Sequence, residues 1–149
     1  LFKHVQPQWA IFGEKDFQQL FIIKKWVKET KSPIEIVNSL LVRDKDGLAL
    51  SSRNIRLSKD GRSAALVISR ALKQASIERS VESARDRLHD VLAGEPNFIL
   101  DYAEIINEDN FEVATSARKG RALVAGWVEG VRLLDNMAMN PRSESAKLT

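Results

Sequence analysis

The chain has 149 residues, of which 44% are hydrophobic and 29% charged, as in a globular protein with enough apolar material for a core. Its formal net charge of +3 suits an anionic small molecule and does not demand a nucleic-acid partner. The absence of cysteine excludes disulfides and thiol catalysis, and no apolar run approaches the roughly 18 residues that span a bilayer, so we expect a cytoplasmic protein without a membrane partner.

The first forty residues predict a strand, a helix and a second strand. A continuous apolar run at 9–12 is typical of a parallel strand covered on both faces, and Gly13 ends it. Asp16 is a candidate N-cap for a helix that runs through about Lys31, and Pro33 stops it. Apolar residues resume at 34–37. The pattern therefore predicts a βαβ unit with parallel strands.

The next segment predicts an extended run, a turn and a long helix. Residues 40–43, three apolar residues followed by Arg43, read as a third extended run, and 44–47 form a turn that ends in Asp-Gly. Residues 48–54 read as a polar loop. Ser58 can cap a helix over 59–76, which carries an alanine-rich apolar stripe.

The last third predicts one more helix and three strands. The helix is expected over 80–93. Alternation of Phe98, Leu100 and Tyr102 with other residues predicts a strand with one apolar face. Two further strands, over 121–128 and 131–137, are joined across Glu129-Gly130, which has the composition of a two-residue hairpin turn.

The pattern changes near residue 42, where we place a domain boundary. Residues 1–41 resemble one piece of a parallel α/β layer, and 42–149 an α+β domain with antiparallel strands. A lone βαβ unit cannot bury both faces of its strands. Because the chain also starts at Leu1, we expect a fragment whose other sheet strands are absent, with the apolar surface of its strands covered by self-association or rearrangement.

The turn after the first predicted strand lies where ligands bind in open α/β sheets. Gly13 permits close approach of a ligand to the backbone, Lys15 suits phosphate, and Asp16 can accept hydrogen bonds from the vicinal hydroxyls of a ribose. Gln19 lies at helical spacing from both charged residues and is expected on their face. Spacing alone leaves an ordinary strand–turn–helix as the alternative.

A second candidate is the loop Leu50-Ser51-Ser52-Arg53. The guanidinium offers a fork of donors and the hydroxyls add neutral ones, as polyphosphate recognition requires. A solvated loop is the alternative. The two histidines, His4 and His89, show no metal-binding spacing, so no metal site is expected in this chain.

Two longer stretches contain these candidates. They read Phe12-Gly13-Glu14-Lys15-Asp16-Phe17-Gln18-Gln19-Leu20 and Asp46-Gly47-Leu48-Ala49-Leu50-Ser51-Ser52-Arg53-Asn54. Together and in this order, they resemble the pantoate–β-alanine ligase family. Val5-Gln6-Pro7 and Arg132-Leu133-Leu134-Asp135-Asn136 are similar to the family as well, so the resemblance covers about residues 1–139.

The resemblance implies a fold and a reaction. Residues 1–41 would be the C-terminal part of a Rossmann-like nucleotidyltransferase domain that binds ATP, and 42–149 a small α+β lid domain. The pantoate carboxylate would attack the α-phosphate of ATP, accompanied by Mg²⁺, to give pantoyl adenylate and pyrophosphate. The amine of β-alanine would then displace AMP to give pantothenate. The protein mainly positions the reactants and neutralises phosphate charge.

The resemblance also implies residue roles. The residues implied to bind ATP are Gly13, Glu14, Lys15, Asp16, Val42, Leu50, Ser51, Ser52 and Arg53. Gly13 and Asp16 would contact the ribose, Lys15 the phosphates and the Val42 backbone the adenine. Residues 50–53 would form a mobile phosphate-binding loop, in which the family often carries Met where this chain has Leu50. Gln19 would bind pantoate.

No catalytic residue is expected within this chain. Family members are roughly twice this length, and their N-terminal half supplies a histidine motif with the proton donor, whereas neither His4 nor His89 is followed by Gly-His. We therefore expect the chain to be inactive alone, and the full-length enzyme to be a homodimer. The alternatives are a related nucleotidyltransferase acting on another acid, a non-catalytic α+β interaction module and a weakly basic nucleic-acid binder.

Overall fold

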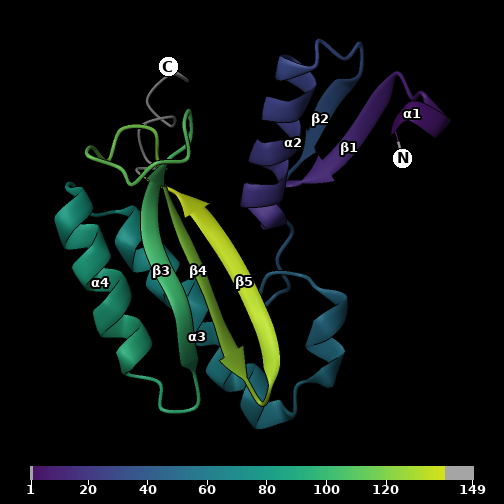
Figure 1. Cartoon of the computed structure of the whole chain (residues 1–149). Coiled ribbons are helices and arrows are strands. Elements are labelled where there is room, and N and C mark those ends of the chain that lie inside the picture. Colours follow the sequence, from purple (N-terminus) through teal and green to yellow (C-terminus); the bar gives the residue numbers. More distant parts are fainter. Residues whose placement is uncertain (1, 140–149) are drawn as a thin grey trace, which may run out of the picture. The chain divides into compact units, whose positions relative to one another are not determined.

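The computed structural model describes residues 2–139 (Figure 1). The chain divides into two compact units, Leu1–Val42 and Arg43–Thr149, one residue from the boundary placed from the sequence. Unit 1 holds a two-stranded parallel sheet and unit 2 a three-stranded antiparallel sheet, which confirms the predicted fold class. No helix within 2–139 is long and apolar enough to cross a membrane.

Unit 1 contains the predicted βαβ arrangement. Its elements are α1 (Phe2–Val5), β1 (Trp9–Gly13), the 3-10 helix η1 (Glu14–Asp16), α2 (Phe17–Glu29) and β2 (Glu35–Ser39). The two strands pair in parallel, from Trp9 opposite Glu35 to Gly13 opposite Ser39. Asp16 occupies the N-cap position as predicted, but its side chain makes no capping hydrogen bond, and the helix ends at Glu29, before the expected Lys31.

Unit 1 leaves much of its apolar surface exposed. In α2 only Leu20 is buried, and Ile34 is buried just before β2. Trp9 and Ile11 of β1 are 63% and 72% exposed, because one helix covers only part of a two-stranded sheet. The expectation of exposed apolar strand surface is confirmed for these residues.

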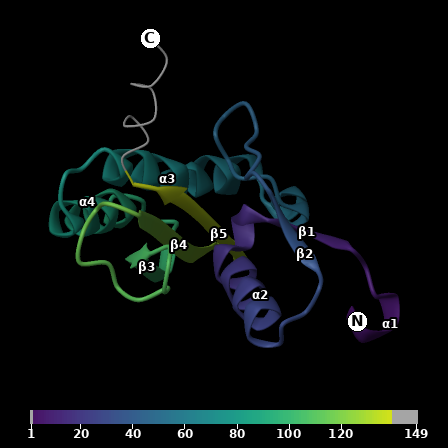
Figure 2. The ribbon, with the colours of Figure 1, turned by 90° about the horizontal axis from the view of Figure 1, so that it is seen from above.

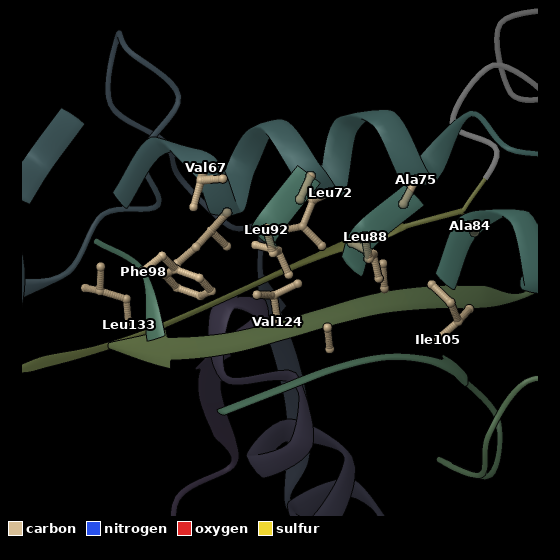
Figure 3. Packing of buried hydrophobic residues seen from close by; sticks show 14 of the residues in the cluster. Val67, Leu72, Ala75, Ala84, Leu88, Leu92, Phe98, Ile105, Val124 and Leu133 are labelled. Atoms are coloured by element: carbon tan, nitrogen blue, oxygen red, sulfur yellow. The ribbon is translucent and has the colours of Figure 1, made fainter. Parts of the chain in front are cut away.

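Unit 2 packs two helices on one face of its sheet (Figures 1 and 2). Its elements are η2 (Ser52–Arg56), α3 (Lys59–Ser76), α4 (Val81–Ala93), β3 (Ile99–Asn107), β4 (Gly120–Val128) and β5 (Val131–Ala138). The strand order is β3-β4-β5, all antiparallel. Leu72 and Leu88 from the helices meet Ile105 and Val124 from the sheet in a continuous apolar core (Figure 3).

Local signals explain where several elements of unit 2 begin and turn. The Ser58 hydroxyl accepts a hydrogen bond from the Gly61 N–H at 3.0 Å, which caps α3 as predicted. At the hairpin between β4 and β5, Glu129 and Gly130 both have positive φ, of 51° and 73°. Two left-handed residues are what a type I′ turn requires, so the predicted two-residue hairpin is confirmed.

Two strand predictions are wrong in detail. Residues 40–43 form no third strand; Arg43 makes only an isolated bridge with Ala49. In β3, a bulge between Leu100 and Tyr102 shifts the alternation of faces. These two side chains are therefore each 38% exposed, although the sequence places them on an apolar face with Phe98. The polar tail from residue 140 lies outside the described residues.

Candidate functional site

The first candidate group follows β1 directly. Gly13 is the last residue of the strand, with φ −73° and ψ 138°, and a Cβ built there meets no atom within 4 Å. These angles suit any residue, so the backbone does not require glycine here. Because glycine has no side chain, the backbone at the carboxyl end of this parallel strand is uncovered, and a ligand can approach it closely.

The turn Glu14–Asp16 is connected to the neighbouring strand. The Glu14 Oε1 accepts a hydrogen bond from Asn38 Nδ2 at 3.3 Å, which joins the carboxyl ends of β1 and β2. Lys15 is half-buried in this turn, whereas Asp16 is exposed. The turn therefore presents one cation and one carboxylate beside the open Gly13 backbone.

Gln19 lies in the first turn of α2 and is exposed. Lys15 and Asp16 lie before it in a 3-10 helix, in which side chains repeat every three residues instead of every 3.6. The α-helical spacing used to place the three residues on one face therefore does not apply as predicted. They remain consecutive parts of one strand–turn–helix connection in unit 1.

The second candidate group forms a capped turn in unit 2. The sequence predicts an irregular loop, but Ser52 and Arg53 begin the 3-10 helix η2, and the Ser51 hydroxyl caps it by accepting from the Arg53 N–H at 3.2 Å. Ser52 and Arg53 are exposed, and Leu50 is half exposed. Arg53 Nη1 also lies 3.4 Å from the carbonyl oxygen of Arg132 on β5.

The turn before this loop is tied to α3 by Arg62. Its Nη2 and Nε lie 2.7 Å and 2.8 Å from carboxylate oxygens of Asp44 and Asp46. The hydrogen bond from Arg62, with a further one from the Leu48 N–H, holds the pKa of Asp46 below its ordinary value. Gly47, at φ 97°, closes the turn in a conformation that side chains rarely adopt.

The polar side chains of β5 bond to partners on other parts of unit 2, and the Asn136 N–H also donates to Asp135 Oδ1 at 2.7 Å. Arg132 bonds to Asp101, Asp135 to Arg43 and Asn136 to Arg121. Sequence reasoning missed the Arg43–Asp135 ion pair because its partners are 92 residues apart. The one signal in the sequence was a carboxylate in a largely apolar strand, because a carboxylate needs a partner when it is buried.

The two candidate groups therefore lie in different units: Gly13 to Gln19 in unit 1, and Leu50 to Arg53 in unit 2. Val42 is exposed at the end of unit 1. Within residues 2–139, no three or more histidine, aspartate or glutamate side chains gather in a way that could hold a metal ion.

Comparison with known proteins gives a consistent result. The family model described as Pantoate-beta-alanine ligase matches residues 1–138. A pantothenate synthetase from Acetivibrio thermocellus is 40% identical over 144 residues, which cover 92% of this chain and 51% of that protein. A pantoate–β-alanine ligase from Arabidopsis thaliana is 39% identical over 146 residues, covering 94% and 47%.

Comparison with solved structures finds matches that carry the same two protein names. A crystal structure of pantothenate synthetase from Thermus thermophilus matches with a TM-score of 0.83 and 37% identity, covering 94% of this chain and 52% of that one. The pantoate–β-alanine ligase from Francisella tularensis, solved with beta-gamma ATP and β-alanine, matches with a TM-score of 0.66 and 26% identity, covering 92% and 46%. The chain thus spans about half the length of the relatives it matches.

Proposed function

The chain belongs to the pantoate–β-alanine ligase family, and we propose that it carries part of the ATP site of an enzyme that joins pantoate to β-alanine. The observation that carries this proposal is the uncovered Gly13 backbone at the carboxyl end of parallel β1, followed by the turn that holds Lys15 and Asp16. In this proposal, 1–41 is the C-terminal part of a Rossmann-like ATP-binding domain and 42–149 is a lid domain.

In unit 1, the ligand groups follow from the chemistry of each residue. The Gly13 main chain lets the ribose lie against it, and the Asp16 carboxylate accepts hydrogen bonds from the ribose hydroxyls. Lys15 places a positive charge at the phosphates, and Glu14 belongs to the same nucleotide-binding turn, which its bond to Asn38 keeps in place. Val42 offers its backbone to adenine.

In unit 2, residues 50–53 bind the phosphates. Because the Ser51 oxygen accepts from the Arg53 N–H, its own hydroxyl proton can still be donated. Ser52 adds a second hydroxyl, and Arg53 a planar guanidinium that matches two phosphate oxygens. Leu50 precedes them in this segment and takes the place where the family often has Met.

The proposed reaction has two displacements. A pantoate carboxylate oxygen bonds to the α-phosphorus of ATP as the bond to the pyrophosphate oxygen breaks. The β-alanine amine then bonds to the acyl carbon, loses a proton, and AMP leaves with the bond electrons. Gln19 orients pantoate through its amide. The ATP and β-alanine named for the Francisella structure support these substrates. We propose that Mg²⁺ binds together with ATP as the Mg·ATP complex, since this ion commonly binds substrate phosphates.

The proton donor is proposed to lie outside this chain, in the N-terminal half of the full-length enzyme. The chain alone then binds nucleotide without turning over, and the full-length enzyme is a cytoplasmic homodimer. The residues of this chain contribute by holding ATP and pantoate in reacting positions and by offsetting phosphate charge, which can account for much of the rate enhancement in such transfers.

The test measures the equilibrium binding of Mg·ATP to the chain by isothermal titration calorimetry. Lys15→Ala is compared with Lys24→Ala, a matched removal of an exposed lysine from α2. We expect Lys15→Ala to weaken binding about tenfold or more, as for loss of a charge-assisted hydrogen bond, and Lys24→Ala to change it less than about twofold. Equal effects of the two substitutions would refute a site at the Glu14–Asp16 turn.

A further inference from the structure

The loop that carries Ser51, Ser52 and Arg53 starts from a short, closed turn. Arg43 and Ala49 pair in an antiparallel bridge, and the Asp44 N–H donates to the Leu48 carbonyl at 2.8 Å. Ala49 also accepts, through its carbonyl, from Asn54 Nδ2 at 3.0 Å. The position of residue 50 therefore depends on where Arg43 holds this turn.

Arg43 is fixed to β5 by an ion pair that the proposed function leaves without a role. Its Nη1 and Nη2 lie 2.5 Å and 2.9 Å from the two carboxylate oxygens of Asp135, and the side chains are only 20% and 5% exposed. The same guanidinium donates to the carbonyls of Gly47, at 3.1 Å, and Asn136, at 3.3 Å. A guanidinium with four acceptors around it has little rotational freedom.

Strand β5 also contacts the far end of the loop. Arg53 Nη1 donates to the carbonyl of Arg132, which lies three residues before Asp135 on the same strand. The start and the end of the segment that runs from Arg43 to Arg53 thus both rest on β5, within unit 2.

We propose that Arg43 is a positioning residue for the triphosphate: its bidentate bond to Asp135 sets the turn 43–49 on β5 and so fixes where Leu50–Arg53 present their donors. This inference rests on the proposed function, since it assigns a purpose to the same phosphate-binding loop. Lysine at position 43 keeps the charge but lacks the planar fork, and it can satisfy only part of the acceptors that surround Arg43.

The experiment compares Arg43→Lys and Asp135→Asn with Arg85→Lys. The control disturbs another ion pair of unit 2, between Arg85 Nη2 and Glu104 Oε1 at 2.8 Å, which joins α4 to β3. Urea unfolding first establishes that each variant is folded. Trypsin then reports on the loop, because Arg53 and Arg56 are exposed cleavage sites in η2.

We expect cleavage after Arg53 and Arg56 to be at least about tenfold faster in the two test variants and unchanged in the control. The Kd for Mg·ATP should rise about tenfold, while the Kd for AMP, which lacks the outer phosphates, should rise less than about twofold. A purely structural role would weaken both ligands by the same factor.

Equal cleavage rates in all four proteins would overturn the proposal, as would parallel loss of ATP and AMP affinity. Absence of ATP binding by the wild-type chain would instead refute the proposed function, and the cleavage rates would then still decide whether Arg43 fixes the loop.

Discussion

Substitution of Gly13 separates a binding role from a structural one. The residue has φ −73° and ψ 138°, and an added Cβ meets no atom within 4 Å. Gly13→Ala should therefore leave the fold intact and raise the free energy of unfolding by about 0.4–1 kcal/mol, because alanine restricts the unfolded chain. The same methyl group would stand where we propose that the ribose lies, so the Kd for Mg·ATP should rise about tenfold, or about 1.4 kcal/mol.

Gly130→Ala is the matched control. A Cβ at Gly130 also meets nothing within 4 Å, but its φ is 73°, so alanine would be strained there by about 1–2 kcal/mol. This variant should lose stability and keep its ATP affinity. Urea unfolding and calorimetric titration of both variants measure the two quantities. If Gly13→Ala binds ATP as tightly as the wild type, the ribose does not lie against this backbone and the reasoning is refuted.

Further predictions concern unit 2. Leu88→Ala should lower the free energy of unfolding of unit 2 by about 2–5 kcal/mol, because Leu88 is fully buried in the core. Ile77→Ala, at an exposed position, should change it by less than about 0.5 kcal/mol. Similar losses of stability for the two variants in urea titrations would contradict the packing described. The pKa of Glu129 is lowered by hydrogen bonds from the Ser58 hydroxyl and N–H. Because its pKa is lower in the folded protein, the carboxylate contributes its full stabilisation at pH values above its ordinary pKa of 4.5. That stabilisation is lost as the pH falls through the lower pKa of the folded state. Unfolding followed from about pH 7 to pH 3 should therefore show a loss of stability that is smaller in Glu129→Gln, and an identical pH profile would exclude this contact as its cause.

The elements that could be predicted from the sequence are those set by neighbouring residues. Ser58 caps α3 through an N–H only three residues away, and Glu129-Gly130 forms the hairpin through its own backbone angles. Hydrophobic spacing likewise located both helices of unit 2 to within a residue.

The features that sequence reasoning missed depend on distant partners. Asp101 lies at the bulge of β3, and its carboxylate accepts from Arg132, 31 residues further along the chain. Alternation of apolar residues carries no sign of such a bulge, so the predicted face of this strand was wrong. Asp16 was expected to cap α2 and does occupy its N-cap position, but it is also the last residue of η1 and its side chain makes no capping hydrogen bond.

The candidate site likewise has parts that could be predicted from neighbouring residues and a part that depends on a distant partner. Gly13 to Asp16 and Ser51 to Arg53 are contiguous motifs, and the family resemblance of the longer stretches that contain them favours phosphate and ribose recognition over an ordinary turn and loop. The Arg43–Asp135 pair beneath the second motif could not be found, because nothing near either residue specifies the other. Contiguous motifs thus identified the candidate ligand groups, and the structure added what supports one of them.

The measurement that tests the central claim most directly is pyrophosphate release with Mg·ATP, pantoate and β-alanine. It is made with the chain alone and with the chain mixed with the separately produced N-terminal half of the Thermus thermophilus pantothenate synthetase, about half of whose length matches this chain. In the proposed function, that half supplies what this chain lacks. The account predicts no release by either half alone and release by the mixture that requires pantoate and is lost in Lys15→Ala. Release by the chain alone, release that Lys15→Ala leaves unchanged, or no release from a mixture of two folded halves would contradict it.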